Sequence, residues 1–233
     1  MEKSTNRRDF IRRTSGGIIG LGLGAGELSR AHDGFAAPQK VKVAVVRNAK
    51  AISDRNVCDK KQAALMIDRA LATVTGKPTA KEAWAALGIT PKDVVGIKVN
   101  CNSAGFALTA HTELVYALCE SLSSVIPPKN VIIYERNASE LERAGFRLNT
   151  TGPGVRCMGA NEGGGYHPQE GLTRIVTDRC TKLINLPSLK TFESNFAGSL
   201  FLKNHIGSIP PDQMSQCHGN TGMTAKILSQ PSL

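Results

Sequence analysis

Two apolar runs separated by a helical segment constrain the fold of this chain more than any other feature. Residues 93–99 (DVVGIKV) form a nearly continuous apolar run, as expected of a strand buried on both faces of a sheet. Residues 109–125 repeat apolar side chains at helical spacing, and residues 130–134 (NVIIY) are again apolar. This order predicts a right-handed βαβ unit over about 93–135. We therefore expect an α/β fold with a mostly parallel sheet flanked by helices.

Shorter patterns predict the remaining elements. Asp59 and Thr79 are candidate N-caps, each followed three residues later by Gln or Glu, and a glycine ends each predicted helix. Four further runs predict strands: residues 41–46, 155–158, 172–176 and 183–186. No internal repeat or linker is apparent, so residues 37–233 are expected to form one domain. Because residues 219–233 predict no element, that domain is expected to be incomplete at its C-terminus.

The N-terminus resembles a twin-arginine (Tat) signal peptide. Arg7 and Arg8 are followed by Phe10 and then by a weakly apolar, glycine-rich segment, residues 16–26. Small residues predict cleavage near Ala36, which makes residues 1–36 the signal. We therefore expect the Tat translocase as a partner and a periplasmic or otherwise extracytoplasmic location. The apolar segment is too short for a spanning helix, and no later stretch is long enough, so no membrane anchor is expected.

The charge balance favours an anionic partner. The chain carries a net charge of +10, of which the predicted signal contributes +2, so +8 remains after cleavage. A basic surface attracts anionic ligands. Aromatic residues make up only 5% of the chain and do not interleave with a Lys/Arg stripe, so nucleic acid is not expected as a partner.

Polar residues follow three of the predicted strands. Ligands of open α/β sheets bind at the carboxyl ends of the strands, which selects the ends of 93–99 and 130–134 and the stretch 182–210. Lys98, within an apolar strand, is expected either to reach water or to pair with an anion. The candidate ligand-binding residues are Lys98, Asn100, Asn102, Lys190, Lys203 and Asn204. Lysines bind carboxylate or phosphate through charge-assisted hydrogen bonds, and His205 is a candidate catalytic acid or base.

A metal ion is the alternative ligand. No two of the six cysteines lie within three residues of each other, which excludes a ferredoxin-type cluster motif, a CxxC zinc ribbon and a CxxCH haem site. The candidate metal ligands are Cys217, His218 and Cys101, joined by His205. Zinc and iron sites need three or four such groups.

The order of the motifs resembles the DUF362 family, a domain of unknown function, in its Tat-exported form. The matching stretches are VAVVRN, WAALGITPKDVVGIKVN, a helix start at Thr109 and His111, KLINLPSLKT and LKNHIG, which together span residues 42–218. The resemblance implies a chain that is truncated at its C-terminus, because relatives continue past the CHGN segment. Some relatives are described as iron–sulfur proteins, but the cysteine cluster of those relatives is missing here. The resemblance implies no reaction.

Three functions are left open by these patterns. The first is a periplasmic catalyst or binder of a small anionic ligand. The second is a non-catalytic metal or cofactor module, associated with iron–sulfur proteins and serving a redox partner. The third is a truncated fragment without a function of its own. The sequence does not decide whether the protein is an enzyme.

Overall fold

The computed structural model describes residues 41–102, 108–189, 201–217, 226–227 and 229–232, with only the backbone at 201–202 and 215–217. Contacts divide the chain after Lys42, and the fold below is that of the unit beginning at Val43. The predictions for residues 1–36 lie outside the described residues.

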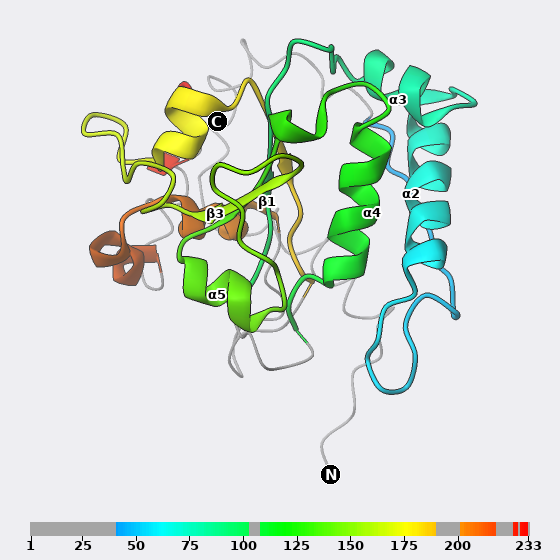
Figure 1. The fold of residues 1–233 in the computed structure, drawn as a ribbon, viewed down its shortest axis with the longest axis horizontal. Coiled ribbons are helices and arrows are strands. Elements are labelled where there is room, and N and C mark those ends of the chain that lie inside the picture. The colour runs from blue at the N-terminus through cyan, green and yellow to red at the C-terminus, as the bar shows by residue number, and fades with distance from the viewer. Residues whose placement is uncertain (1–40, 103–107, 190–200, 218–225, 228, 233) are drawn as a thin grey trace, which may run out of the picture. The chain divides into compact units, whose positions relative to one another are not determined.

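Four parallel strands in the order β3-β2-β1-β4 form the sheet (Figure 1). The strands are β1 (Val95–Lys98), β2 (Val131–Glu135), β3 (Arg156–Gly159) and β4 (Lys182–Asn185). In register, Lys98 lies beside Tyr134 of β2 and beside Asn185 of β4. The expected α/β class and the parallel βαβ unit, with α4 (Thr112–Leu122) as its crossover helix, are confirmed.

Helices flank the sheet, and α2 packs against α4 (Figure 1). The α-helices besides α4 are α2 (Lys60–Thr75), α3 (Ala80–Ala86) and α5 (Ala138–Arg143). The shorter helical turns are η2 (Pro128–Asn130), η3 (Ile175–Arg179), η4 (Phe201–Ser208) and η5 (Pro211–Cys217). Among the described residues, no helix combines the length and apolar character needed to cross a membrane.

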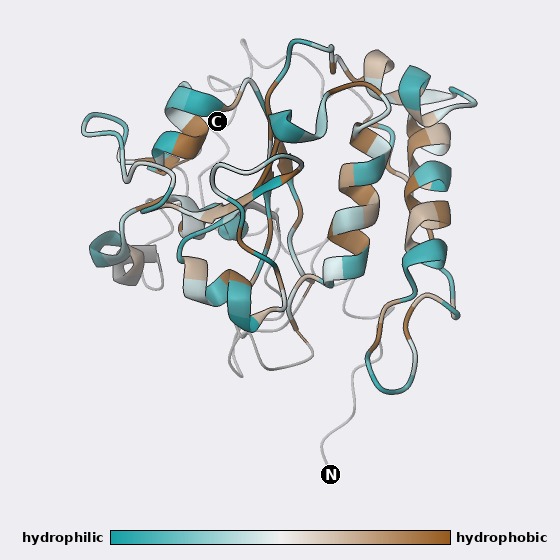
Figure 2. Cartoon of the chain, viewed as in Figure 1, coloured by the Kyte–Doolittle hydropathy of each residue, from teal (hydrophilic) through white to brown (hydrophobic). Residues whose placement is uncertain are grey.

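Alternate residues of β2 bury their side chains in two different clusters. Val131 and Ile133 pack with α4 and α3, whereas Ile132 and Tyr134 pack with η3. Both faces of the strand are therefore apolar, which explains the uninterrupted run in the sequence. Figure 2 shows the same apolar character along the central strands and a mixture of polar and apolar residues along α2 and α4.

The predicted helix starts are confirmed. The Asp59 carboxylate accepts from the backbone N–H of Lys61 and Gln62 at 2.8 and 3.0 Å, and the Thr79 hydroxyl accepts from that of Glu82 at 3.2 Å. Gly76 ends α2 with φ +72°, in the left-handed region that glycine adopts without strain.

Two predicted strands are wrong. Residues 41–46 form no strand and belong to no sheet, and Val43 and Val45 are 76% and 73% exposed. Local β propensity makes no strand without a neighbour to pair with. Residues 172–176 contain only an isolated bridge from Thr173 to Tyr166 and then lead into η3, and Leu172, Ile175 and Val176 are buried. A short apolar run does not distinguish a buried strand from a buried helical turn.

Candidate functional site

The predicted residues at the strand ends meet at one edge of the sheet. Because β1, β2 and β4 are parallel, their carboxyl ends share that edge. The sheet grows from β1 toward β2 and β3 on one side and toward β4 on the other. The topological switch point therefore lies between β1 and β4, the place where α/β proteins bind ligands.

A buried ion pair joins the ends of β1 and β2. The Lys98 Nζ lies 2.6 Å from Glu135 Oε1, with side chains only 1% and 5% exposed. Lys98 Nζ also donates to the carbonyl of Val99 at 2.7 Å. The Glu135 carboxylate accepts from the backbone N–H of Cys101 and Arg136 at 3.0 and 2.9 Å. Of the two expectations for Lys98, it pairs with an anion, and that anion is a side chain of the protein itself.

Three asparagine side chains meet at the switch point. Asn204 Nδ2, on η4, donates to the carbonyl of Lys98 at 3.1 Å and to Asn185 Oδ1 at 2.7 Å. Asn100 Nδ2 donates to Asn204 Oδ1 at 3.2 Å. The three amides come from the end of β4, from the residues after β1 and from η4. They fasten η4 to the edge of the sheet between β1 and β4.

A second polar chain runs from His205 into the core. His205 Nδ1 and the Tyr134 hydroxyl each lie 3.4 Å from Ser208 Oγ, and all three residues are buried. Burial, and next the charge of Lys98, lowers the pKa of His205 to about 4. Burial raises the pKa of Tyr134 above its ordinary value. His205 is therefore a neutral imidazole at pH 7, able to exchange hydrogen bonds but holding no proton to donate as imidazolium.

Gly207 lets η4 approach the ion pair. A Cβ at this position would lie 2.2 Å from Glu135 Oε1 and 2.7 Å from Lys98 Nζ. Such distances leave no room for any side chain. The backbone of η4 thus covers the ion pair directly.

The remaining predicted residues lie around this cluster or outside the described residues. Lys203 is half-buried on η4 beside Asn204, and Asn102 is exposed after Cys101. Lys190, His218 and the signal residues Arg7, Arg8 and Phe10 lie outside the described residues, as does the side chain of Cys217.

Of the candidate metal ligands, only Cys101 and His205 have side chains among the described residues. Cys101 is fully buried, and desolvation, followed by the charge of Glu135, raises the pKa of its thiol. In the described part of the chain, no three His, Cys, Asp or Glu side chains are grouped so that they could hold a metal ion. A metal site that includes Cys217 and His218 stays a prediction.

Sequence reasoning missed three members of the cluster. Asn185 lies near the carboxyl end of the predicted strand 183–186 and is the last residue of β4, so the rule that selected Asn100 could have selected it too. Tyr134 and Ser208 gave no such signal, because a single Tyr or Ser in an apolar context is ordinary core composition.

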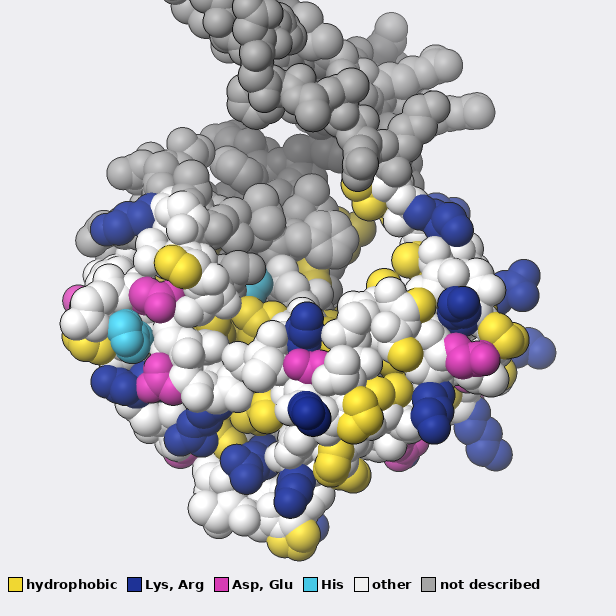
Figure 3. Space-filling view, turned by 90° about the horizontal axis from the view of Figure 1, so that it is seen from above, with side chains coloured by type: hydrophobic (Ala, Val, Ile, Leu, Met, Phe, Trp, Pro, Cys, Tyr) yellow, Lys and Arg dark blue, Asp and Glu magenta, His cyan; other side chains and the backbone are white. Residues whose placement is uncertain are grey.

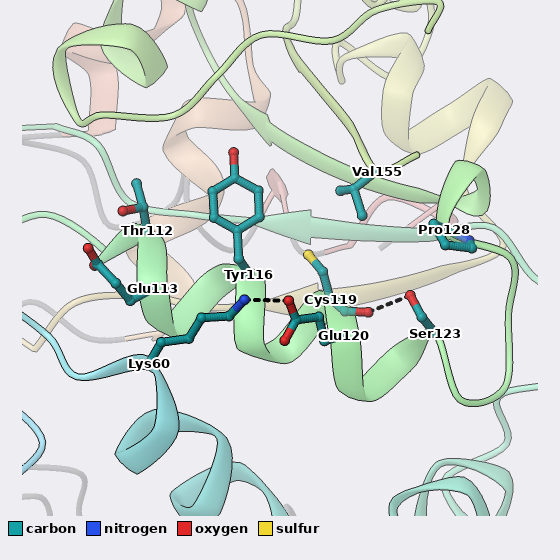
Figure 4. A pocket seen from close by; sticks show the side chains of 9 residues that line it. All are labelled: Lys60, Thr112, Glu113, Tyr116, Cys119, Glu120, Ser123, Pro128 and Val155. Carbon is teal, nitrogen blue, oxygen red and sulfur yellow. Dashed lines mark hydrogen bonds and ion pairs between the residues drawn. The ribbon is translucent and has the colours of Figure 1, made fainter. Parts of the chain in front are cut away.

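A groove of about 540 Å³ lies elsewhere, between α4 and the segments that carry Lys60, Pro128 and Val155 (Figure 4). Tyr116 and Cys119 of α4 line it, and the ion pair between Lys60 and Glu120 spans one side. None of the predicted site residues lines this groove. It is thus separate from the cluster at the carboxyl edge.

The fold and the cluster define an α/β protein with a buried polar site at its topological switch point. Comparison with protein-family models, with curated proteins and with solved structures gave no match. The resemblance to DUF362 therefore stays a prediction.

Proposed function

We propose that the carboxyl edge binds a small anion, a carboxylate or a phosphate, in an exported protein of the DUF362 type. The observation that carries this proposal is the meeting of Asn100, Asn185 and Asn204 at the switch point between β1 and β4. Each amide comes from a different segment, and Lys203 lies beside Asn204 on η4. Neutral amides beside a cation are also groups that orient an oxyanion.

The proposal gives the cluster residues two kinds of role. Because Glu135 compensates the charge of Lys98, this pair fixes the ends of β1 and β2 rather than attracting the ligand. Asn204 likewise holds η4 in place through Lys98 and Asn185. Direct contact with the anion is assigned to Lys203, Asn100 and Asn102, together with Lys190 as the sequence predicts.

Charge supports an anionic ligand over a cationic one. The chain carries a net charge of +10, and Lys and Arg side chains are spread even over the face opposite the carboxyl edge, which Figure 3 shows, so the basic character belongs to the surface as a whole. His205 fits the same ligand, since an anion beside the ring would favour its protonated form and raise its pKa. The imidazole could then take up a proton on binding.

The test is a thermal-shift titration of the full chain with inorganic phosphate and with succinate, against sodium chloride at equal ionic strength. We expect the two anions to raise the Tm beyond the chloride control. Asn100→Ala and Lys203→Met should remove that additional rise.

Lys92→Met is the matched control. Lys92 is exposed before β1, at the opposite edge of the sheet, so this variant removes the same charge away from the site. It should keep the response to both anions. Equal responses in all three variants would show that the anions bind the basic surface as a whole and would refute the proposal.

A further inference from the structure

Two arginine side chains on one face of β3 have no carboxylate partner among the described residues. Arg156, the first residue of β3, is half-buried, and its Nε is a buried atom without a hydrogen-bond partner in the described part of the chain. Arg179, the last residue of η3, is also half-buried, and its Nη1 donates to the sulfur of Met158 at 3.6 Å. A thioether is a weak acceptor, and charged groups removed from water are normally paired. Two such guanidinium groups indicate an anion-binding site.

The backbone brings the two guanidinium groups to the same place. Side chains alternate along a strand, so Arg156 and Met158 lie on one face of β3, the face that packs against η3. Two positions along a strand span about 6.6 Å. Arg179 reaches this face from the end of η3, since its Nη1 contacts Met158. Its Nη2 lies beside the glycine-rich loop after β3, where a Cβ at Gly164 would be 3.9 Å away. One small ligand can therefore contact both groups.

Acidic side chains on the elements around β3 have other neighbours. Asp178 of η3 forms an ion pair with Arg174 at 2.7 Å. Asp93, buried before β1, accepts hydrogen bonds from two threonine hydroxyl groups at 2.7 and 2.6 Å. Glu162 lies at the other end of β3, where its Oε2 would be 2.6 Å from a Cβ at Gly159. The charges of the two arginines are thus left for a ligand to compensate.

A third cation lies at the same end of β3. The turn η2 contacts β3, and its middle residue, Lys129, is exposed. Three positive charges favour an anion that carries more charge than a single phosphate group. Each guanidinium group can bind one phosphoryl group through two parallel N–H donors. Two linked phosphoryl groups therefore match both arginines.

We propose that Arg156 and Arg179 bind a diphosphate group, with Lys129 at the rim of the site. The Nε of Arg156 donates to one phosphoryl group, and the guanidinium of Arg179 donates to the other. The site is separate from the carboxyl edge, because Arg156 begins β3 and lies at the amino edge of the parallel sheet. It does not depend on the function proposed for the carboxyl edge.

The test is isothermal titration calorimetry of the full chain with inorganic diphosphate in magnesium-free buffer. We expect a Kd of about 100 µM or below, and inorganic phosphate should bind at least about tenfold more weakly because it satisfies one guanidinium group only. Arg156→Met and Arg179→Met should each weaken diphosphate binding at least about tenfold. Diphosphate that binds no more tightly than phosphate would overturn the proposal.

Two control variants locate the site. Arg143→Met removes an exposed arginine of α5, outside the proposed site, and should bind diphosphate like the parent. Lys203→Met should also keep tight binding, because Lys203 belongs to η4 at the carboxyl edge. If Lys203→Met loses tight binding while Arg156→Met keeps it, diphosphate binds at the carboxyl edge and the proposal is wrong.

Stability without the ligand separates a binding role from a structural one. Arg156→Met keeps an apolar side chain and removes a buried polar atom that has no described partner, so its Tm in plain buffer should equal or exceed that of the parent. Diphosphate should raise the Tm of the parent but not that of the variant. A variant clearly less stable than the parent in plain buffer would mean that the arginine supports the fold, which contradicts the proposal.

The diphosphate group occurs as a free ion and as the end of an ester, and ADP separates these two sources. An affinity for ADP within about threefold of that for diphosphate assigns the site to diphosphate esters, and weaker ADP binding assigns it to the free ion. Both results support the site. A parent that binds neither probe overturns the proposal.

Discussion

At the scale of single residues, the ion pair of Lys98 and Glu135 decides the character of the site. Each charge is removed from water almost completely, which is costly unless the partner is present. The sequence indicated that a lysine inside an apolar strand needs an anion or a route to water. It did not identify Glu135 as that anion, because the two residues are 37 positions apart and only the parallel register of β1 and β2 brings them together.

Removing one member of this pair should destabilise the protein more than removing both. Lys98→Met or Glu135→Gln leaves a buried charged group with its partner lost, and each should lower the free energy of unfolding by about 3–5 kcal/mol. The double variant should lose less than either single variant, since no uncompensated charge remains. Urea unfolding of the four proteins completes the cycle.

A single variant that fails to fold still tests this prediction, provided that the double variant regains a cooperative transition. Additive losses in the cycle would contradict it, and they would mean that the two side chains act independently.

At the scale of elements, residues with a local signal were predicted and residues that depend on distant contacts were not. Asp59 and Thr79 cap their helices because a capping residue acts on the backbone next to it. Residues 41–46 and 172–176 have the composition of strands, yet neither becomes one. A strand exists only through its neighbour, and the position of a neighbour is not encoded locally.

The seating of η4 on the sheet depends on Gly207. We expect Gly207→Ala to lower the free energy of unfolding by about 1–3 kcal/mol, the range for an oversized group in a packed interior. The added methyl group would collide with Glu135 Oε1 and Lys98 Nζ, so either the ion pair or η4 must move. Urea unfolding with tryptophan fluorescence measures the change.

The matched background is the double variant Lys98→Met/Glu135→Ala, in which the nearest colliding atom is gone. In this double variant, Gly207→Ala should lower the free energy of unfolding clearly less than it does in the parent. An equal cost in both backgrounds would mean that the glycine serves the local backbone of η4 and not its approach to the ion pair.

At the scale of the whole molecule, the strand order explains why the predicted site residues come together. Lys98, Asn100 and Asn204 were selected separately, and one rule about the carboxyl ends of parallel strands correctly placed them at a common edge. The rule has no means of predicting which side chains would neutralise each other there. It left the cluster as a set of candidate ligand groups, whereas most of its described hydrogen bonds are internal and hold the edge together.

The buried state of His205 ties the stability of the whole fold to pH. Its pKa is about 4 in the folded protein against an ordinary 6.5, so the unfolded chain binds the proton more readily. Stability from this group is complete above about pH 6.5 and is lost as the pH falls toward 4. Between pH 7.5 and 5 the loss should be about 2 kcal/mol. Urea unfolding at the two pH values measures it.

His205→Asn isolates this contribution, because asparagine keeps a polar group near the position of Nδ1 but does not titrate. The variant should be less stable than the parent at pH 7.5, and the difference should shrink or reverse at pH 5.

His111→Asn, at the N-cap of α4, is the control for losing a histidine outside the cluster. The groups nearest His205 are Lys98 and Ser208, with Glu135 behind them, and all three stay in place in both variants. If the parent and the His205→Asn variant lose stability in parallel as the pH falls, the acid sensitivity arises from carboxylates elsewhere. Asp93 is one such carboxylate, because hydrogen bonds from Thr181 and Thr90 lower its pKa.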